Sequence, residues 1–449
     1  MNSIARSVCP VCLKAIPAHH ETIEGNTYLL KECPEHGAFK TVVWRAGTSF
    51  KEWSRTKIPS QPKTPFTAVD RGCPYDCGLC AAHGQHTCTA LLEVTWRCDL
   101  GCPVCFASSG KKAAPDPSQA EISQLLERVE LASGFCNIQL SGGEPTMRDD
   151  LAELIALAKK RGFPFIQLNT NGLRIAREEG YAQRLAEAGL DSVFLQFDGT
   201  EDAIYSSLRG RPLMAEKRAA IEALSQAGIG IVLVPVVVPG LNDHNLGAIL
   251  DLAVQNSPHV RGVHFQPVSY FGRYPQAPGD EERITLPELM DLLEVQSGGA
   301  VHAADFQPPG CEHSHCSFNG NYMVTEEGGL TKLSAGGKCD CAPRPAREGA
   351  DKAKSFVKRQ WAGVKQSLPM AGALEDDLGR FISRAASHSL AISAMAFQDA
   401  WTLDFERLRG CCIHVVSPDG RLIPFCAYNL TSMDGETLYR GKCNGPIPS

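Results

Sequence analysis

Hydrophobic and polar positions between residues 91 and 268 follow two alternating patterns. Short apolar runs recur between longer segments whose apolar positions repeat every third or fourth residue. The predicted strands are 91–95, 137–141, 164–169, 192–197, 230–237 and 262–267, and the predicted helices are 118–132, 149–161, 176–188, 213–227 and 244–255. This alternation predicts an α/β fold in which helices cover the outside of a parallel sheet.

Polar residues recur at every second position along several of these strands. They are Gln167, Asn169 and Asn171 along one strand, Gln196 and Asp198 along the next, and His264 and Gln266 along the last. A period of two points each set to one face of the sheet. Because polar groups in an apolar interior cost free energy unless they bind something, we expect a ligand on that face. The alternative is that these polar side chains only satisfy one another.

The α/β alternation ends after residue 272. Further helices are predicted at 286–296, 351–365 and 374–396. Before the alternation, Pro59, Pro62 and Pro65 lie close together and predict an extended linker over residues 47–67. A barrel-like core over residues 91–300 is therefore expected to carry additional segments at both ends of the chain.

Composition changes this picture mainly through cysteine. The chain has 449 residues, a net charge of -6 and 43% hydrophobic residues, which favours neither nucleic acid nor an anionic membrane as a partner. Its nineteen cysteines are clustered at short intervals, which favours metal binding over disulfides. The longest apolar run, 229–238, is broken by Pro235 and too short to span a bilayer. With no apolar export signal in the first thirty residues, we expect a reducing cytoplasm.

Three cysteines form a CxxxCxxC motif directly after the predicted strand 91–95. Cys98, Cys102 and Cys105 lie on one short loop, which can wrap three thiolates around three corners of a [4Fe-4S] cluster. A structural zinc site would need a fourth ligand, and no Cys or His follows until Cys136. The fourth iron is therefore expected to stay open for a ligand, as catalytic metal sites do.

A Ser-Gly-Gly-Glu-Pro-Thr motif follows at residues 141–146. Gly142 and Gly143 would let the backbone approach a bound molecule closely, and the Glu144 carboxylate could hold an ammonium group. Together with the cysteine triplet, this motif resembles the radical S-adenosylmethionine (SAM) superfamily. The resemblance implies an open (β/α)6 partial barrel whose cluster iron binds the amino and carboxylate groups of SAM.

The resemblance also implies where SAM lies. Residues 169–172 are expected by its ribose, and residues 230–233 by its adenine. The predicted cofactor-binding residues are Gly142, Gly143, Glu144, Asn169, Asn171, Gln196, Asp198 and Gln266.

A second triplet of the same spacing precedes the first. Cys73, Cys77 and Cys80 follow the proline-rich linker rather than a strand, and Cys88 is a candidate fourth ligand. A filled coordination shell is typical of a permanently ligated auxiliary [4Fe-4S] cluster. The alternative for this segment is a second zinc site.

Residues 1–46 contain a small metal knuckle. Cys9 and Cys12 precede a predicted hairpin that turns at residues 24–26, and Cys33 and His36 follow it. Two such ligand pairs can surround one ion tetrahedrally, as in zinc ribbons and rubredoxin knuckles. A structural zinc that lets this module fold is favoured over a redox-active iron.

The C-terminal region holds further cysteines that can meet only if the chain folds back over the barrel. A second auxiliary cluster is predicted from Cys311, Cys316, Cys412 and Cys426, whereas Cys339, Cys341, Cys411 and Cys443 are spare thiols or alternative ligands. The predicted domains are thus the knuckle (1–46), the linker and first auxiliary segment (47–90), the barrel (91–300) and the auxiliary-cluster region (301–449).

The knuckle, the Cys-Pro-Tyr-Asp-Cys-Gly-Leu-Cys segment and a C-terminal Pro-Phe-Cys-Ala-Tyr-Asn run together resemble the tetraether-lipid-synthase-like branch of the superfamily, which includes bacterial TrsS-type proteins. The resemblance implies reductive cleavage of SAM to a 5′-deoxyadenosyl radical, which abstracts hydrogen from an unactivated position of a lipid-like substrate. A flavodoxin or ferredoxin is the expected electron donor. The alternatives are a peptide or small-molecule maturase and a non-enzymatic iron-sulfur electron-transfer protein.

Overall fold

Residues 3–110, 115–333, 343–363, 377–443 and 447 are described by the computed structural model. The main sheet has the strand order β14-β13-β16-β12-β10-β9-β8-β7-β6-β17-β18. Every neighbouring pair from β16 to β17 is parallel. The central strands are β6 (Thr89–Thr95), β7 (Asn137–Gly142), β8 (Ile166–Thr170), β9 (Ser192–Gln196), β10 (Gly230–Val234) and β12 (Val260–Pro267), with β11 (Val236–Val237) as a short extension beside β12. The predicted parallel α/β barrel is confirmed.

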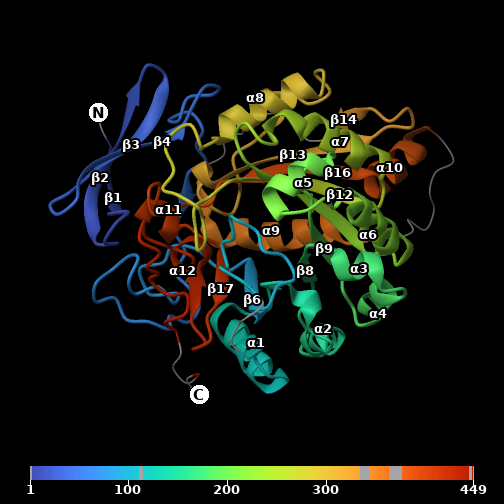
Figure 1. The fold of residues 1–449 in the computed structure, drawn as a ribbon, viewed down its shortest axis with the longest axis horizontal. Helices are drawn as coiled ribbons and strands as arrows, with labels where there is room; N and C mark the ends of the chain where they lie inside the picture. Colours follow the sequence, from blue (N-terminus) through green and yellow to red (C-terminus); the bar gives the residue numbers. More distant parts are fainter. Residues whose placement is uncertain (1–2, 111–114, 334–342, 364–376, 444–446, 448–449) are drawn as a thin grey trace.

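The helices between these strands cover the outside of the sheet (Figure 1). They are α1 (Gln119–Ser133), α2 (Leu151–Lys160), α3 (Leu173–Arg177), α4 (Tyr181–Glu187), α5 (Asp202–Arg209), α6 (Met214–Gln226) and α7 (Leu246–Gln255). Helix α1 begins where expected because Ser118 and Glu121 form a capping box. The helix predicted over 176–188 is wrong in one respect: Gly180 has a φ of 74° and separates α3 from α4.

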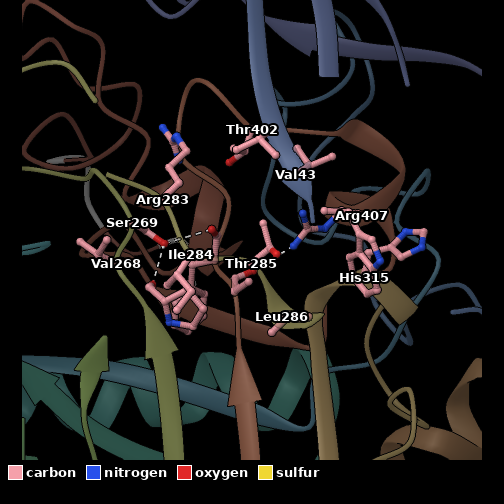
Figure 2. Close-up of a pocket in the computed structure, with 15 residues that line it drawn as sticks. Val43, Val268, Ser269, Arg283, Ile284, Thr285, Leu286, His315, Thr402 and Arg407 are labelled. Atoms are coloured by element: carbon pink, nitrogen blue, oxygen red, sulfur yellow. Dashed lines mark hydrogen bonds between the residues drawn. The ribbon is translucent and has the colours of Figure 1, made fainter. Parts of the chain in front are cut away.

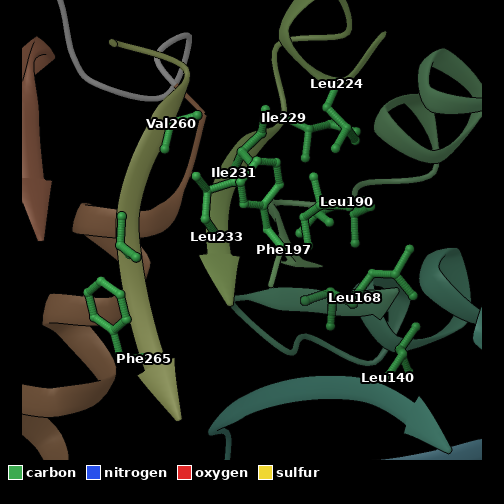
Figure 3. Packing of buried hydrophobic residues seen from close by; sticks show 14 of the residues in the cluster. Leu140, Leu168, Leu190, Phe197, Leu224, Ile229, Ile231, Leu233, Val260 and Phe265 are labelled. Atoms are coloured by element: carbon green, nitrogen blue, oxygen red, sulfur yellow. The ribbon is translucent and has the colours of Figure 1, made fainter. Parts of the chain in front are cut away.

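The apolar core lies between the sheet and these helices (Figure 3). Leu140, Leu168, Ile231 and Leu233 are almost completely buried on neighbouring strands. Leu224, at the end of α6, packs from the helical side. Burial of each such side chain contributes about 1.5–3 kcal/mol, so this layer fixes the strands whose opposite face forms the barrel interior.

Residues after 300 extend the same sheet at both of its edges. Their elements are β13 (Ser317–Val324), β14 (Leu330–Lys332), α9 (Ala346–Trp361), α10 (Asp377–Ser387), β16 (Ser389–Met395), α11 (Phe405–Arg409), β17 (Ile413–Val416), β18 (Leu422–Pro424) and α12 (Phe425–Tyr428). The single helix predicted over 374–396 is wrong in its second half. Residues 389–395 form strand β16 because they find two partners there, β12 and β13.

Helix α9 lies across the N-terminal ends of several barrel strands. The Gln360 amide donates to the carbonyl oxygens of Arg261 (3.0 Å) and Ser389 (3.1 Å), near the starts of β12 and β16. A Cβ atom on Gly230, the first residue of β10, would lie only 2.0 Å from the Trp361 carbonyl oxygen. This end of the barrel is therefore closed by α9, and a ligand must enter from the other end.

The N-terminal module is an antiparallel sheet of β1 (Ser3–Val8), β2 (Ala15–Ile23), β3 (Asn26–Cys33) and β4 (Gly37–Trp44). The predicted hairpin turns at Glu24 and Gly25, both at positive φ. Two cations fasten the module to the rest of the chain. The Lys31 ammonium donates to the Ala400 carbonyl oxygen (2.7 Å), and Arg45 pairs with Glu288 (3.2 Å) on α8 (Leu286–Gln296).

Two further strands, β5 (Lys57–Ile58) and β15 (Arg344–Pro345), pair with each other. Among the described residues, none of the helices has the length and hydropathy needed to cross a membrane.

Candidate functional site

The Cys98 loop begins at the C-terminal end of β6, opposite the end that α9 closes. Its three thiols, on Cys98, Cys102 and Cys105, are partly exposed. Arg273 fixes the loop: its backbone pairs with that of Cys105 (2.9 and 3.0 Å), and its Nε donates to the Cys102 carbonyl oxygen (3.0 Å). Burial raises the pKa of the Cys98 thiol to about 12, so a bound cation is needed to hold it as a thiolate. These thiols fit the binding of an iron-sulfur cluster.

The two glycines of the second motif approach the chain itself. A Cβ atom on Gly142 would lie 2.1 Å from the Thr95 carbonyl oxygen, and one on Gly143 would lie 2.1 Å from that of Arg97. The Gly143 amide donates to Thr95 (2.8 Å), and the Glu144 amide donates to Arg97 (2.8 Å). The sequence predicted that these two glycines let the backbone come close to a ligand. In the structure they let it come close to the end of β6, which carries the Cys98 loop.

Glu144 is buried and its carboxylate already accepts from several protein groups. Oε1 accepts from the Thr146 amide (3.0 Å) and from the hydroxyls of Thr146 and Thr170 (both 2.7 Å), and Oε2 accepts from the Asn171 amide (2.7 Å). Burial raises the pKa of this carboxyl despite these donors. Glu144 therefore joins its own motif to the end of β8, whereas the sequence suggested a carboxylate free to hold an ammonium.

Asn171 and Asn169 behave differently. The Asn171 side-chain amide donates to the Asp99 carboxylate within the cysteine loop (2.7 Å), and its side-chain oxygen accepts from the Leu173 backbone amide (2.9 Å). Asn169 donates weakly to Ser141 (3.4 Å), and its buried side-chain oxygen has no partner. An orphaned acceptor in a buried place is costly, so Asn169 fits a position that faces a ligand.

Part of the polar lumen is satisfied internally. Gln139 donates to Gln167 (3.1 Å), and Gln167 donates to Ser192 (3.3 Å). His264 bonds to Ser393 (2.8 Å), and burial lowers its pKa to about 4. For these residues the alternative interpretation, mutual satisfaction, describes the structure. Gln266 is half-buried near the end of β12, beside Val236.

Two buried, positively charged side chains in this region were not predicted from the sequence. Arg209 forms a bidentate pair with Asp198 (2.7 Å to each oxygen) and also contacts the Cys102 thiol. Lys217, fully buried on α6, donates to the Asn171 carbonyl oxygen (2.6 Å) and the Gln196 side chain (3.4 Å). Each is one charged residue of a helix, so nothing in the pattern distinguished it from a surface charge.

The C-terminal segment reaches the same end of the barrel. Arg440 grips the Glu93 carboxylate on β6 with two bonds (2.7 and 3.0 Å), and the Tyr428 hydroxyl donates to it (3.3 Å). The Arg440 guanidinium also lies 5.8 Å from the centroid of the Phe106 ring, next to Cys105. Residues from opposite parts of the chain thus brace the Cys98 loop, as a C-terminal region folded over the barrel should.

The second triplet is held near the C-terminus of the chain. The Cys73 and Cys77 thiols contact each other, and Cys80 lies nearby. The Cys77 amide donates to the Tyr439 hydroxyl (3.0 Å). Cys88, the fourth ligand predicted for this triplet, is instead grouped with Cys311 and Cys412. The reason is strand pairing, because β6 and β17 start side by side and carry Cys88 and Cys412 with them.

The C-terminal ligand set predicted from the sequence is divided in the structure. Cys311 and Cys412 join Cys88, whereas Cys316 and Cys426 line an adjoining cavity of about 30 Å³ together with Cys411. Cys412 and Glu312 also line this cavity, so it borders the group formed by Cys88, Cys311 and Cys412. Cys339 and Cys341 lie outside the described residues. Cys136 is buried, as expected of a core residue.

The knuckle brings its predicted ligands together. The metal-binding atoms of Cys9, Cys12, Cys33 and His36 all lie within 4.8 Å of one another. The His36 Nδ1 is 3.6 Å from the Cys9 sulfur and 3.5 Å from the Cys33 sulfur. This mixed thiol and imidazole set fits one tetrahedral ion.

A cavity of about 50 Å³ separates this module from the barrel (Figure 2). Val43 lines it from β4, and Arg283 and Arg407 lie on opposite sides. Both guanidinium groups are already engaged: Arg283 pairs with Asp399 (2.9 Å), and Arg407 donates to the Ala396 carbonyl oxygen (2.9 Å). This small cavity is a packing gap at the interface between the N-terminal module and the barrel.

Comparison with known proteins agrees with the description of both the barrel and the N-terminal module. Residues 92–253 match the family model of the radical SAM superfamily, and residues 1–45 match the HMPTM N-terminal zinc ribbon domain. A 7,8-dihydro-6-hydroxymethylpterin dimethyltransferase of Methanocaldococcus jannaschii is 35% identical over 94% of this chain and 92% of its own length. A probable GTP 3′,8-cyclase of Methanothermobacter thermautotrophicus is 32% identical over 36% of this chain and 53% of its own length.

Among solved structures, Streptococcus suis SuiB bound to precursor peptide SuiA is similar at a TM-score of 0.41 and 15% identity, covering 48% of this chain and 46% of its own. The Methanocaldococcus jannaschii relative, which matches nearly the whole chain, and the two family models together identify the family of this protein. The superfamily implies a [4Fe-4S] cluster and SAM as cofactors, and the described thiols fit that requirement. The resemblance drawn from the two motifs is confirmed, and the chain belongs to the radical SAM superfamily as an enzyme with an N-terminal zinc ribbon.

Proposed function

We propose that the loop of Cys98, Cys102 and Cys105 holds the [4Fe-4S] cluster at which the chain cleaves SAM. When bound there, the cluster supplies the electron for the reductive cleavage of SAM to methionine and a 5′-deoxyadenosyl group that takes hydrogen from the substrate. The observation that carries this proposal is the position of the three thiols, at the open end of the barrel and beside a polar interior.

The residues around the loop support the binding of SAM. Asn169 offers a buried acceptor without a partner, which suits a hydroxyl or ammonium donor. Lys217 is a buried ammonium whose hydrogen bonds go to amide oxygens, and a ligand carboxylate would compensate its charge better. Gln196 and Asp198 stand next to these groups, and Gln266 near the end of β12 stays a predicted contact.

For the substrate, we propose a small polar heterocycle of the reduced-pterin class. The Methanocaldococcus jannaschii relative is named for action on a dihydropterin, and it matches nearly the whole chain. Asn169 and Gln196 place half-buried amide side chains at the open ends of β8 and β9, and the Asn169 side-chain oxygen has no partner, which suits a hydrogen-bonding ring better than an alkyl chain. A lipid-like substrate, which the sequence resemblance favoured, would need a long apolar channel.

The test is an anaerobic assay with SAM and a reductant, in which the substrate is varied. We expect a reduced pterin to increase 5′-deoxyadenosine formation above its uncoupled level, as read by mass spectrometry. A phospholipid offered in parallel should leave the yield at its uncoupled level. The opposite result, stimulation by the lipid and none by the pterin, would replace the substrate proposal but leave the SAM cleavage proposal intact. Flavodoxin or ferredoxin as donor and a cytoplasmic location remain part of the proposal.

A further inference from the structure

We propose that Cys88, Cys311 and Cys412 bind one zinc-class metal ion, with Glu312 as the fourth ligand. The three sulfur atoms all lie within 4.8 Å of one another and are buried. The site lies where β6 and β17 begin, at the end of the barrel opposite the Cys98 loop. It is therefore separate from the place of SAM cleavage and from the zinc ribbon.

Hydrogen bonds to backbone carbonyl oxygens bring these distant residues together. The Cys88 backbone amide donates to the Cys412 carbonyl oxygen (2.8 Å), which places the two side chains at the starts of neighbouring parallel strands. The Gln85 side-chain amide donates to the Cys311 carbonyl oxygen (2.6 Å), which ties the third ligand to the same segment. The thiols are thus held in place by the fold itself, before any metal binds.

The spacing favours a single ion over a cluster. Thiolates bound about 2.3 Å from one tetrahedral zinc ion stand about 3.8 Å apart. A cubane cluster binds each thiolate at a different iron, so its thiolates must stand further apart. Among the residues that the structure describes, only this group and the zinc ribbon ligands meet the close spacing, and the thiols of the Cys98 loop do not.

Glu312 is the proposed fourth ligand because its carboxylate already contacts the group. The Cys412 thiol donates to Glu312 Oε2 (3.8 Å), and the other carboxylate oxygen accepts from the Ser317 hydroxyl. The carboxylate oxygens do not lie within 4.8 Å of all three sulfur atoms, so the side chain must turn toward the ion when it binds. Three thiolates and a carboxylate around a divalent ion leave two negative charges. The cations acting on this site are Lys57, which also donates to the Glu312 carbonyl oxygen, and Lys354 on α9. Their charges offset the excess, so the donor set is electrostatically reasonable.

The surroundings indicate a structural role. Ala350 of α9 packs directly against the three cysteines. A Cβ atom on Gly349 would lie 2.1 Å from the Gly310 carbonyl oxygen, so α9 touches the loop that carries Cys311. One ion here would join β6, β17 and this loop beneath α9, and its binding free energy would stabilise the closed end of the barrel.

The first test is the metal and acid-labile sulfide content of anaerobically prepared protein. The wild type should hold about two zinc ions per chain, one here and one in the ribbon. Cys311→Ala should lose one zinc and keep its iron and sulfide, whereas Cys136→Ala, which removes a nearby buried thiol, should lose nothing. A wild type with one zinc, or a Cys311→Ala variant that loses iron and sulfide together, would overturn the proposal.

Glu312→Gln tests the fourth ligand without removing a thiol. The variant should release this zinc to a chelator at least about tenfold faster than the wild type, because an amide is a weaker ligand than a carboxylate. The ribbon zinc serves as the internal control and should leave at an unchanged rate. Release of both zinc ions at wild-type rates would show that Glu312 is not a ligand.

Discussion

At the scale of single residues, the Ser-Gly-Gly-Glu-Pro-Thr motif has a structural role within the protein in addition to any role in ligand binding. Gly142 and Gly143 are required because the Thr95 and Arg97 carbonyl oxygens leave no room for a side chain. Glu144 is saturated by donors from Thr146, Thr170 and Asn171. The sequence predicted that these positions are important for binding a ligand. It could not show that they also join two strand ends, because the groups that donate hydrogen bonds to Glu144 belong to residues outside any recognisable motif.

Glu144→Ala should therefore lower both stability and SAM affinity. Loss of the carboxylate leaves several buried donors unsatisfied and should reduce the free energy of unfolding by about 2–5 kcal/mol. Glu144→Gln, which keeps one acceptor oxygen, should lose less. Urea unfolding and SAM titration of the two variants provide the measurement. Unchanged SAM affinity in Glu144→Ala at full cluster content would contradict any role of this residue in the site.

His264 should make the protein sensitive to acid. Its folded-state pKa of about 4 lies below the ordinary value of 6.5, so its contribution to stability is present above pH 6.5 and is lost as the pH falls toward 4. The loss amounts to at most about 3 kcal/mol. The free energy of unfolding of His264→Gln should fall less than that of the wild type between about pH 7 and pH 4.5. Equal losses in the two proteins would exclude this residue as a source of acid sensitivity.

At the scale of elements, periodicity predicted the barrel well because each strand and helix there is local. The predictions for 286–296 and 192–197 agree with α8 and β9 to within one residue. The failure at 389–395 has a physical cause: β16 is stabilised by pairing with β12 and β13, which are distant in sequence. The same is true of β17, whose partner β6 lies more than 300 residues earlier.

The N-terminal module is an element whose stability should depend on its metal. Cys9→Ser or His36→Ala should release one zinc and expose β1–β4 to limited proteolysis, because a sheet this small has little core of its own. Iron content should stay at the wild-type level. Cys136→Ala is a suitable control, since Cys136 is a buried core thiol outside the module. Stoichiometric iron at this site in the purified protein, in place of zinc, would contradict the structural role.

At the scale of the whole molecule, the ligand sets depend on how distant segments meet. The four candidate ligands of the zinc ribbon could be grouped from the sequence because they lie within one short segment, and the structure brings them together. The Cys98 triplet also lies within one short loop, and its role as a cluster ligand set stays a prediction. The grouping of Cys88 with Cys311 and Cys412 could not be predicted, since it follows from the pairing of β6 with β17 and from the position of the loop before β13. The spacing of cysteines along the chain gives no information about contacts between segments that are distant in sequence.

The central claim is that only one of two triplets with identical spacing cleaves SAM. The most direct measurement compares Cys102→Ala and Cys73→Ala, prepared anaerobically, for the formation of 5′-deoxyadenosine and methionine from SAM. Cys102→Ala should give only background, because it removes a ligand from the loop at the open end of the barrel. Cys73→Ala should still cleave SAM, at least as an uncoupled reaction. Cleavage that persists in Cys102→Ala and disappears in Cys73→Ala would contradict the account.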